Sequence, residues 1–183
     1  FYRFNYDITE LLNLGKKNQL EVKVAKESAN RSINAAERKA DWWLFGGIYR
    51  PVWLEVLPQI HMEHFVLNAD HHGKLQAAVD MAGDAKGHEI IVSVRSLKDG
   101  KNVYTSNGQT TITHSISNSD KEQMISGEWA SIIPWSTENP NLYVAKLELK
   151  NPEGKIVQTR ETRIGFRTVE FFPQDGVYLN CTK

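Results

Sequence analysis

The chain has 183 residues, with 22 basic and 22 acidic side chains, so its formal net charge is zero. This balance argues against nucleic acid as a partner, because phosphate binding requires a basic excess or a basic stripe. Cys181 is the one cysteine, so an internal disulfide is impossible, and no apolar run approaches the roughly 20 residues that span a membrane. We therefore expect neither a nucleic-acid partner nor a membrane partner.

Residues 1–58 are rich in aromatic side chains but contain few complete elements. Residues 7–15 (DITELLNLG) predict one helical turn. The apolar–charged alternation over 19–25 (QLEVKVA) predicts a half-buried strand, and 48–58 (IYRPVWLEVLP) predicts a strand that proline restricts to an edge or a bulge. Residues 29–41 hold helix-forming residues without an apolar stripe, so we expect a loop there.

From residue 59 onward the strand pattern becomes regular. Strands are predicted over 61–70, 74–83, 89–97, 102–116, 123–132, 141–150 and 155–166. The breaks between them hold turn-forming residues, such as Asp99-Gly100. About seven strands with turns every 8 to 12 residues indicate an immunoglobulin-like β-sandwich, so the predicted fold class is all-β.

Both ends of the sequence look cut from something longer. The chain begins at Phe1 rather than at a methionine and shows no signal-peptide pattern, and it stops after YLNCTK (178–183). Residues 1–58 supply too few strands for a closed sandwich or jelly roll, which needs about seven or eight. We therefore expect a fragment, and its cellular compartment stays open.

Three stretches resemble the family 2 glycoside hydrolases, the β-galactosidase and β-glucuronidase group. They are FNYDITELLNLGKKNQLEVKVA (4–25), DWWLFGGIYRPVWLEVLP (41–58) and PWSTENPNLYVAKLELKNPEGKIVQTRETRIGFRTVE (134–170), and QDGVYLN (174–180) resembles the lead-in to the family's catalytic barrel. The resemblance implies that residues 1–58 are the C-terminal strands of a sugar-binding jelly roll. Residues 59–167 would then be the immunoglobulin-like sandwich, and 168–183 a linker to a (β/α)8 barrel.

The same resemblance implies that the parent protein is a retaining, exo-acting β-glycosidase. Retaining chemistry needs two carboxylates about 5 to 5.5 Å apart, and in the family both are glutamates on the barrel. We therefore expect no catalytic residue and no cofactor in this chain, which should be inactive alone. A terminal β-galactoside is the default substrate, while β-glucuronidase and β-mannosidase parents stay open because they share these segments.

Asp41 is the one substrate-binding residue that the resemblance implies. The aspartate at this motif position hydrogen-bonds sugar hydroxyls in several family members, and a carboxylate can accept from two adjacent hydroxyls. The alternative is that Asp41 caps a turn or pairs with Arg38 or Lys39. Trp42 and Trp43 are adjacent on a strand, so at most one faces a sugar, and we expect both to pack in a core or an interface.

The other conspicuous residues have structural interpretations. His61 and His64 lie three apart, which in a regular strand places them on opposite faces, so we expect no metal site. Tyr143 and Trp135 resemble core and corner residues of the sandwich. Phe166 and Arg167 are expected to anchor the join to the barrel.

Two other functions remain possible at this point. The chain could be a free carbohydrate-binding module that uses its aromatic patch, or a structural domain in an assembly. Family members are commonly oligomers, so a homo-oligomer is also possible.

Overall fold

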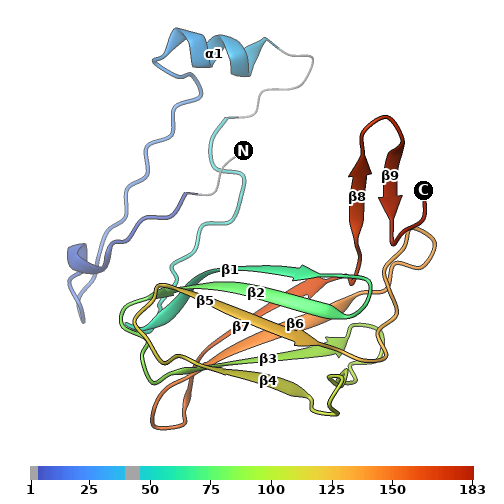
Figure 1. Cartoon of the computed structure of the whole chain (residues 1–183). Helices are drawn as coiled ribbons and strands as arrows, with labels where there is room; N and C mark the ends of the chain where they lie inside the picture. The colour runs from blue at the N-terminus through green and yellow to red at the C-terminus, as the bar shows by residue number, and fades with distance from the viewer. Residues whose placement is uncertain (1–3, 40–45) are drawn as a thin grey trace. The chain divides into compact units, whose positions relative to one another are not determined.

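A computed structural model describes residues 4–39 and 46–183. The chain divides into two compact units, Phe1–Leu54 and Glu55–Lys183, which are best considered separately (Figure 1). Within the described ranges, no helix is both long enough and apolar enough to cross a membrane.

The first unit contains helical elements and no strand among its described residues. The 3-10 helix η1 (Thr9–Leu11) confirms the helical turn predicted over 7–15. The loop predicted over 29–41 is wrong, because helix α1 (Arg31–Arg38) forms there. Asn30 explains the helix: its side chain accepts hydrogen bonds from the first free backbone N–H groups, which stabilises a short run of helix formers.

The strands predicted over 19–25 and 48–58 are also wrong. Leu20, Val22 and Val24, which were expected on a buried face, are 73%, 54% and 51% exposed. An alternating sequence becomes a strand only when a neighbouring strand satisfies its backbone groups and a second layer covers its apolar side. Among the described residues of this unit, no strand is available to supply that ladder.

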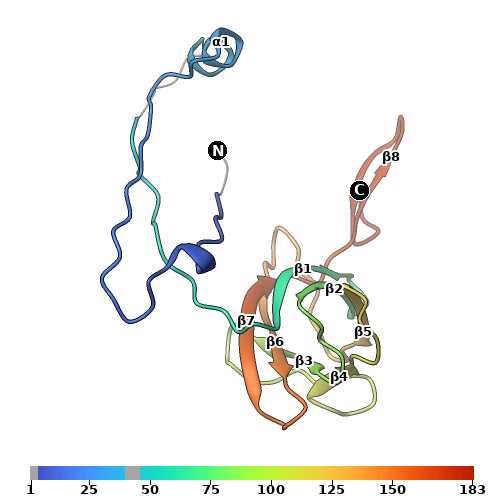
Figure 2. The same cartoon turned by 90° about the vertical axis from the view of Figure 1, so that its left-hand side faces the viewer.

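The second unit is an antiparallel β-sandwich, which confirms the all-β, immunoglobulin-like prediction. One sheet has the order β1-β2-β5, built from His61–Ala69, Lys74–Ala82 and Glu122–Glu128. The other has the order β4-β3-β6-β7, built from Thr111–Ser115, Glu89–Ser96, Tyr143–Lys150 and Ile156–Ile164. Figure 2 shows the two sheets facing each other.

Alternation along the strands explains the core between the sheets. Successive side chains of a strand point to opposite faces, so every second residue of β2, β3 and β6 is buried. The central apolar residues are Leu75, Ala77, Val79, Met81, Ile90, Val92, Val94, Ala145, Leu147 and Leu149, none more than 2% exposed. Burying a Leu, Ile or Val side chain contributes about 1.5 to 3 kcal/mol, so this unit has a core of its own.

The strand predicted over 102–116 is shorter than expected. Only Thr111–Ser115 forms a strand (β4), because Asn107-Gly108 turns the chain before it. Thr105 stabilises that turn: its hydroxyl donates to the Gln109 carbonyl at 2.9 Å and accepts from the Gln109 N–H at 3.0 Å.

A β-bulge in β1 overturns the expectation for the two histidines. The register shifts between Met62 and His64, so Glu63 is an extra residue in the strand. His61 then pairs with Ala82 and His64 with Asp80, two positions on the same outward face of β2. Even so, the described residues contain no group of three or more His, Cys, Asp or Glu side chains that could hold a metal ion.

Gln158 of β7 closes the open corner between the two sheets. Its side chain is buried and accepts from the Met62 N–H at 2.6 Å while donating to the Met62 carbonyl at 3.2 Å. One amide side chain thus satisfies both backbone groups of Met62, as a neighbouring strand would. Nearby, Arg160 donates to Glu55 at 2.5 Å.

Candidate interaction surface on the C-terminal hairpin

Asp41, the predicted substrate-binding residue, lies outside the described residues, as do Trp42 and Trp43. Its proposed pairing partner Arg38 contacts other groups: the guanidinium lies 3.3 Å from a Glu27 carboxylate oxygen and donates to the Lys26 carbonyl at 3.3 Å. The role of Asp41 therefore stays a prediction.

In the described part of the chain, the candidate interaction surface lies at the C-terminal end. Residues expected to form a linker contain a two-stranded antiparallel hairpin, β8 (Val169–Phe172) and β9 (Gly176–Leu179). Pro173, Gln174 and Asp175 make the turn between them, with Gln174 in the left-handed region at φ 66°. In Figure 1 the hairpin projects away from both sheets of the sandwich.

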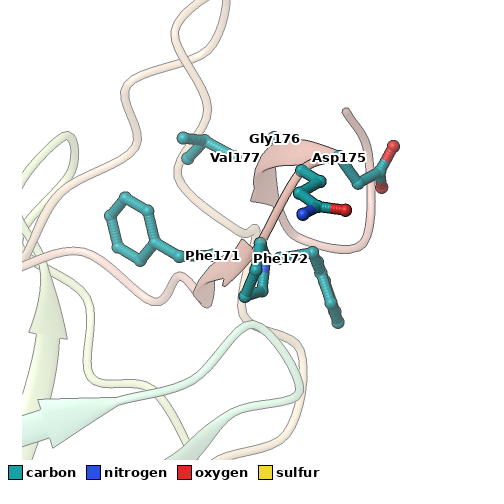
Figure 3. A pocket seen from close by; sticks show the side chains of 7 residues that line it. Phe171, Phe172, Asp175, Gly176 and Val177 are labelled. Carbon is teal, nitrogen blue, oxygen red and sulfur yellow. The ribbon is translucent and has the colours of Figure 1, made fainter.

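One face of this hairpin is entirely apolar. Val169 lies opposite Leu179, and Phe171 lies opposite Val177, so these four side chains share one face. We name them the apolar hairpin face. Phe171 is 75% exposed, Val177 53% and Val169 46%. Figure 3 shows Phe171 and Val177 on one side of the hairpin, with Phe172 pointing away from them.

The opposite face is held by local contacts near the turn. The rings of Phe172 and Tyr178 meet edge to face at 5.1 Å. The Tyr178 hydroxyl donates to Asp175 at 2.6 Å, and Lys183 lies 2.5 Å from the same carboxylate. The hydrogen bond from Lys183, joined by that from Tyr178, lowers the pKa of Asp175, and the bond to Asp175 raises the pKa of Tyr178.

Asn180 joins the end of the hairpin to the sandwich. Its side chain donates to the Trp135 carbonyl at 2.9 Å and accepts from the Thr168 N–H at 3.0 Å. Its own backbone N–H donates to the Thr168 carbonyl at 2.9 Å. Asn180 has φ 51°, a conformation that asparagine tolerates better than most residues. The two bonds to Thr168 thus close the base of the hairpin, and the bond to Trp135 ties this base to the sandwich.

A second set of contacts supports the same joint. The Arg167 N–H donates to the Ala69 carbonyl at 3.0 Å, and the Arg167 guanidinium lies 4.9 Å from the centre of the Trp135 ring. His71 Nδ1 and Thr168 Oγ1 are 2.6 Å apart, while His71 Nε2 lies 3.8 Å from the Cys181 sulfur. The hairpin is therefore anchored at its base and exposed along its apolar face.

The structure separates the residues that were expected at the join. Phe166 is fully buried in the sandwich core, where its ring meets Tyr143 edge to face at 5.3 Å. Tyr143 itself is a corner residue, because its hydroxyl accepts from the Ile133 N–H at 2.7 Å. Arg167 and Trp135 lie at the base of the hairpin.

Sequence reasoning missed the hairpin, although a signal for it was present. Apolar residues alternate on both sides of the PQDG turn (173–176), which is the pattern of two short paired strands. The roles of Asn180 and His71 had no such signal, because their partners lie 45 and 97 residues away along the chain.

The relatives of the chain are carbohydrate-processing enzymes by name. It is 30% identical to a putative beta-glucuronidase of Formosa agariphila over 98% of this chain and 16% of that protein. It is 32% identical to a beta-galactosidase of Kluyveromyces lactis over 93% of this chain and 18% of that protein. The chain therefore spans about a sixth of the length of these curated relatives.

Solved structures show the same architecture. A beta-glucuronidase of Parabacteroides merdae superposes with a TM-score of 0.58 at 25% identity, covering 79% of this chain and 18% of that one. A beta-glucuronidase of Bacteroides uniformis gives a TM-score of 0.58 at 22% identity over 80% of this chain and 19% of its own, a likeness in fold alone. Residues 60–167, a range that spans strands β1 to β7 of the sandwich, match the model of the glycosyl hydrolases family 2. The chain therefore belongs to glycosyl hydrolases family 2.

Proposed function

We propose that this chain is the non-catalytic portion of a longer, retaining, exo-acting β-glycosidase whose substrate is a terminal β-galactoside. The observation that carries the proposal is the family match over 60–167, together with relatives that align over nearly all of this chain but are about six times longer. Several of these relatives are named beta-galactosidases, including those of Clostridium acetobutylicum and Kluyveromyces lactis.

In this proposal the sandwich acts as a spacer that carries no chemistry of its own. The core between its sheets is filled with apolar side chains, and its described residues form no metal-binding group. The two carboxylates of retaining hydrolysis belong to a barrel outside residues 1–183, one as acid/base and one as nucleophile. Asp41 would contribute from the first unit by accepting hydrogen bonds from sugar hydroxyls.

A β-glucuronide is the second candidate substrate. The Formosa agariphila relative is named a putative beta-glucuronidase, and the Parabacteroides merdae structure is a beta-glucuronidase. The two sugars differ at C6, which is a carboxylate in a glucuronide and a hydroxymethyl group in a galactoside. An assay with both glycosides distinguishes the two substrates by this difference.

The test compares the chain of 183 residues with the longer protein that contains it. Both are incubated with 4-nitrophenyl β-galactoside and, separately, with the β-glucuronide. We expect the longer protein to hydrolyse the galactoside with retention at the anomeric carbon, seen by proton NMR as β-sugar forming first, and the short chain to be inert. Faster release of 4-nitrophenol from the glucuronide than from the galactoside would reassign the substrate to a β-glucuronide. Turnover by the short chain would refute its non-catalytic role.

Asp41 is tested in the same longer protein. Losing a charge-assisted hydrogen bond to substrate costs about 2 to 3 kcal/mol, so Asp41→Ala should lower kcat/KM by roughly 30- to 100-fold. Glu10→Ala, at an exposed carboxylate of the same unit, is the matched control and should leave kcat/KM unchanged. Equal kinetics for the two variants would return Asp41 to a structural role.

The free carbohydrate-binding module is addressed by calorimetry. We expect no measurable heat when galactose, glucuronic acid or lactose is titrated into the chain alone, because a sugar site needs several convergent polar groups around an enclosed surface. Saturable binding by the short chain would favour the module over the fragment.

A further inference from the structure

The apolar hairpin face is exposed, while the base of the hairpin is firmly anchored. We propose that this face is covered by the polypeptide that follows Lys183 in the longer protein, and that this polypeptide begins as a third strand paired to the free edge of β9. The inference rests on the proposed function, since it requires that the chain is one part of a longer enzyme.

The hairpin is too small to be a stable sheet by itself. A hairpin of two strands is only marginally stable in water, and three or more strands with a covered apolar face are needed for independent stability. β8 and β9 contribute four residues each, and Phe171, the largest side chain of the apolar hairpin face, is 75% exposed. An anchored, uncovered face of this kind is typical of a surface that packs on another structure.

The turn that follows β9 has the geometry of a hairpin loop. Asn180 and Cys181 have φ values of 51° and 66°, and the flanking residues Leu179 and Thr182 exchange backbone hydrogen bonds of 2.8 and 2.9 Å. Two central residues with positive φ between bonded partners define a two-residue hairpin loop. Thr182 is therefore the first residue of a strand running antiparallel to β9.

Strand geometry then determines which edge of β9 is used. Leu179 directs its N–H and carbonyl toward Thr182, and backbone groups two residues apart in a strand point to the same edge. Val177 therefore directs its N–H and carbonyl to that same edge, away from β8. A strand continuing from Thr182 would meet these groups and widen the hairpin into a three-stranded sheet.

The length of the relatives and the position of the Thr182 turn together favour one occupant. About five sixths of each named relative lies outside the aligned region, so a longer protein has enough chain to cover this face. The face also shares its base with the Thr182 turn, so the first residues after Lys183 lie closest to it. A second copy of the chain is the competing occupant, and it becomes an outcome of the test.

Hydrogen exchange tests the strand. The Val177 amide should exchange at least about tenfold more slowly in the longer protein than in the chain of 183 residues, because only the longer protein supplies its acceptor. Equal exchange rates in the two proteins would overturn the third strand. Concentration-dependent protection in the short chain alone, together with a dimer by light scattering, would assign the face to a second copy and overturn the proposal.

A substitution tests the covered face. Phe171→Ser should leave the melting temperature of the short chain unchanged, because the ring is exposed there, and should lower that of the longer protein. Val66→Ser is the matched control, because Val66 is 69% exposed on β1, and it should have the same small effect in both proteins. If Phe171→Ser is equally neutral in the longer protein, the face is not covered.

The two proposals fail separately. A longer protein that hydrolyses neither glycoside but protects Val177 would refute the proposed function and keep the docking surface. A longer protein that hydrolyses the galactoside while Val177 exchanges freely would refute the docking surface alone.

Discussion

Replacing Asn180 by alanine should release the hairpin from the sandwich without unfolding the sandwich. The substitution removes the side-chain donor to the Trp135 carbonyl and the acceptor for the Thr168 N–H. It also leaves a residue with a Cβ and no compensating side-chain bond at φ 51°. The perturbation should be confined to the joint, because Asn180 is not one of the residues that form the buried core between the sheets.

The expected magnitude follows from these contacts. Each lost hydrogen bond contributes about 1 kcal/mol, and the left-handed conformation costs alanine about 1 kcal/mol more than glycine. Asn180→Ala should therefore destabilise the closed joint by about 3 kcal/mol, which corresponds to roughly a hundredfold more opening. Asn180→Gly loses the same bonds but tolerates the backbone conformation, so about 2 kcal/mol and roughly thirtyfold are expected.

Amide hydrogen exchange measures this directly in the chain of 183 residues. The N–H of residue 180, which donates to the Thr168 carbonyl, should exchange fastest in the alanine variant, more slowly in the glycine variant and slowest in the original protein. Amides in the β3–β6 ladder serve as the internal reference and should be unchanged. Exchange at residue 180 within threefold of the original protein in both variants, or equal acceleration across β3 and β6, would refute the reasoning.

Three further predictions concern the sandwich and the hairpin turn. Gln158→Leu leaves the Met62 N–H and carbonyl buried without partners and should lower the free energy of unfolding, measured in urea, by about 2 to 5 kcal/mol. The control Gln76→Leu, on the exposed face of β2, should change the free energy of unfolding little. Similar values for the two variants would contradict the corner role of Gln158. Gly73→Ala would place a Cβ against the Trp129 carbonyl oxygen at φ 99° and should cost at least about 2 kcal/mol. Gly100→Ala, with open space at φ 71°, should cost about 1 kcal/mol, and the reverse order in thermal melts would be incompatible with the clash. Asp175 has a lowered pKa, so its contribution to the stability of the turn is present above the ordinary carboxyl pKa and is lost as the pH falls through the pKa of Asp175 in the folded protein. Tyr178 has a raised pKa, so its contribution to the stability of the turn is lost as the pH rises through the pKa of Tyr178 in the folded protein. Asp175→Asn should return the Tyr178 titration, followed by ultraviolet absorbance, to that of a free tyrosine near pH 10, and an unchanged titration would exclude the Asp175–Tyr178 bond as its cause.

The surface that we propose to function in this chain is a packing surface on the C-terminal hairpin. Family membership came from the sandwich, residues 60–167, whereas the exposed apolar residues and the anchoring contacts lie just beyond it. A sandwich with a filled core can hold the hairpin at a fixed angle, because Trp135, Thr168 and Asn180 connect the two through short hydrogen bonds. Such a joint would orient whatever structure covers the apolar hairpin face.

The sequence by itself determined the sandwich and the positions of its strands, except that the strand predicted over 102–116 begins only at Thr111. Alternation in β2, β3 and β6 and the glycine turns between strands are local signals, and they specify which side chains turn inward before any partner is known. The motifs likewise identified the family, since they are read residue by residue. The same alternation misled us over 19–25, because a strand also needs a neighbour, and no local pattern reports whether one is present.

Tertiary structure alone decided the remaining features. The bulge at Glu63 reverses the face of every residue on one side of it, and it follows from how β1 pairs with β2. Gln158 and Asn180 are ordinary polar residues in the sequence, and they matter because folding places them beside backbone groups that would otherwise lack partners. Periodicity is a property of neighbours along the chain, whereas hydrogen-bond satisfaction is a property of neighbours in space. This is why the first could be read from the sequence and the second required the fold.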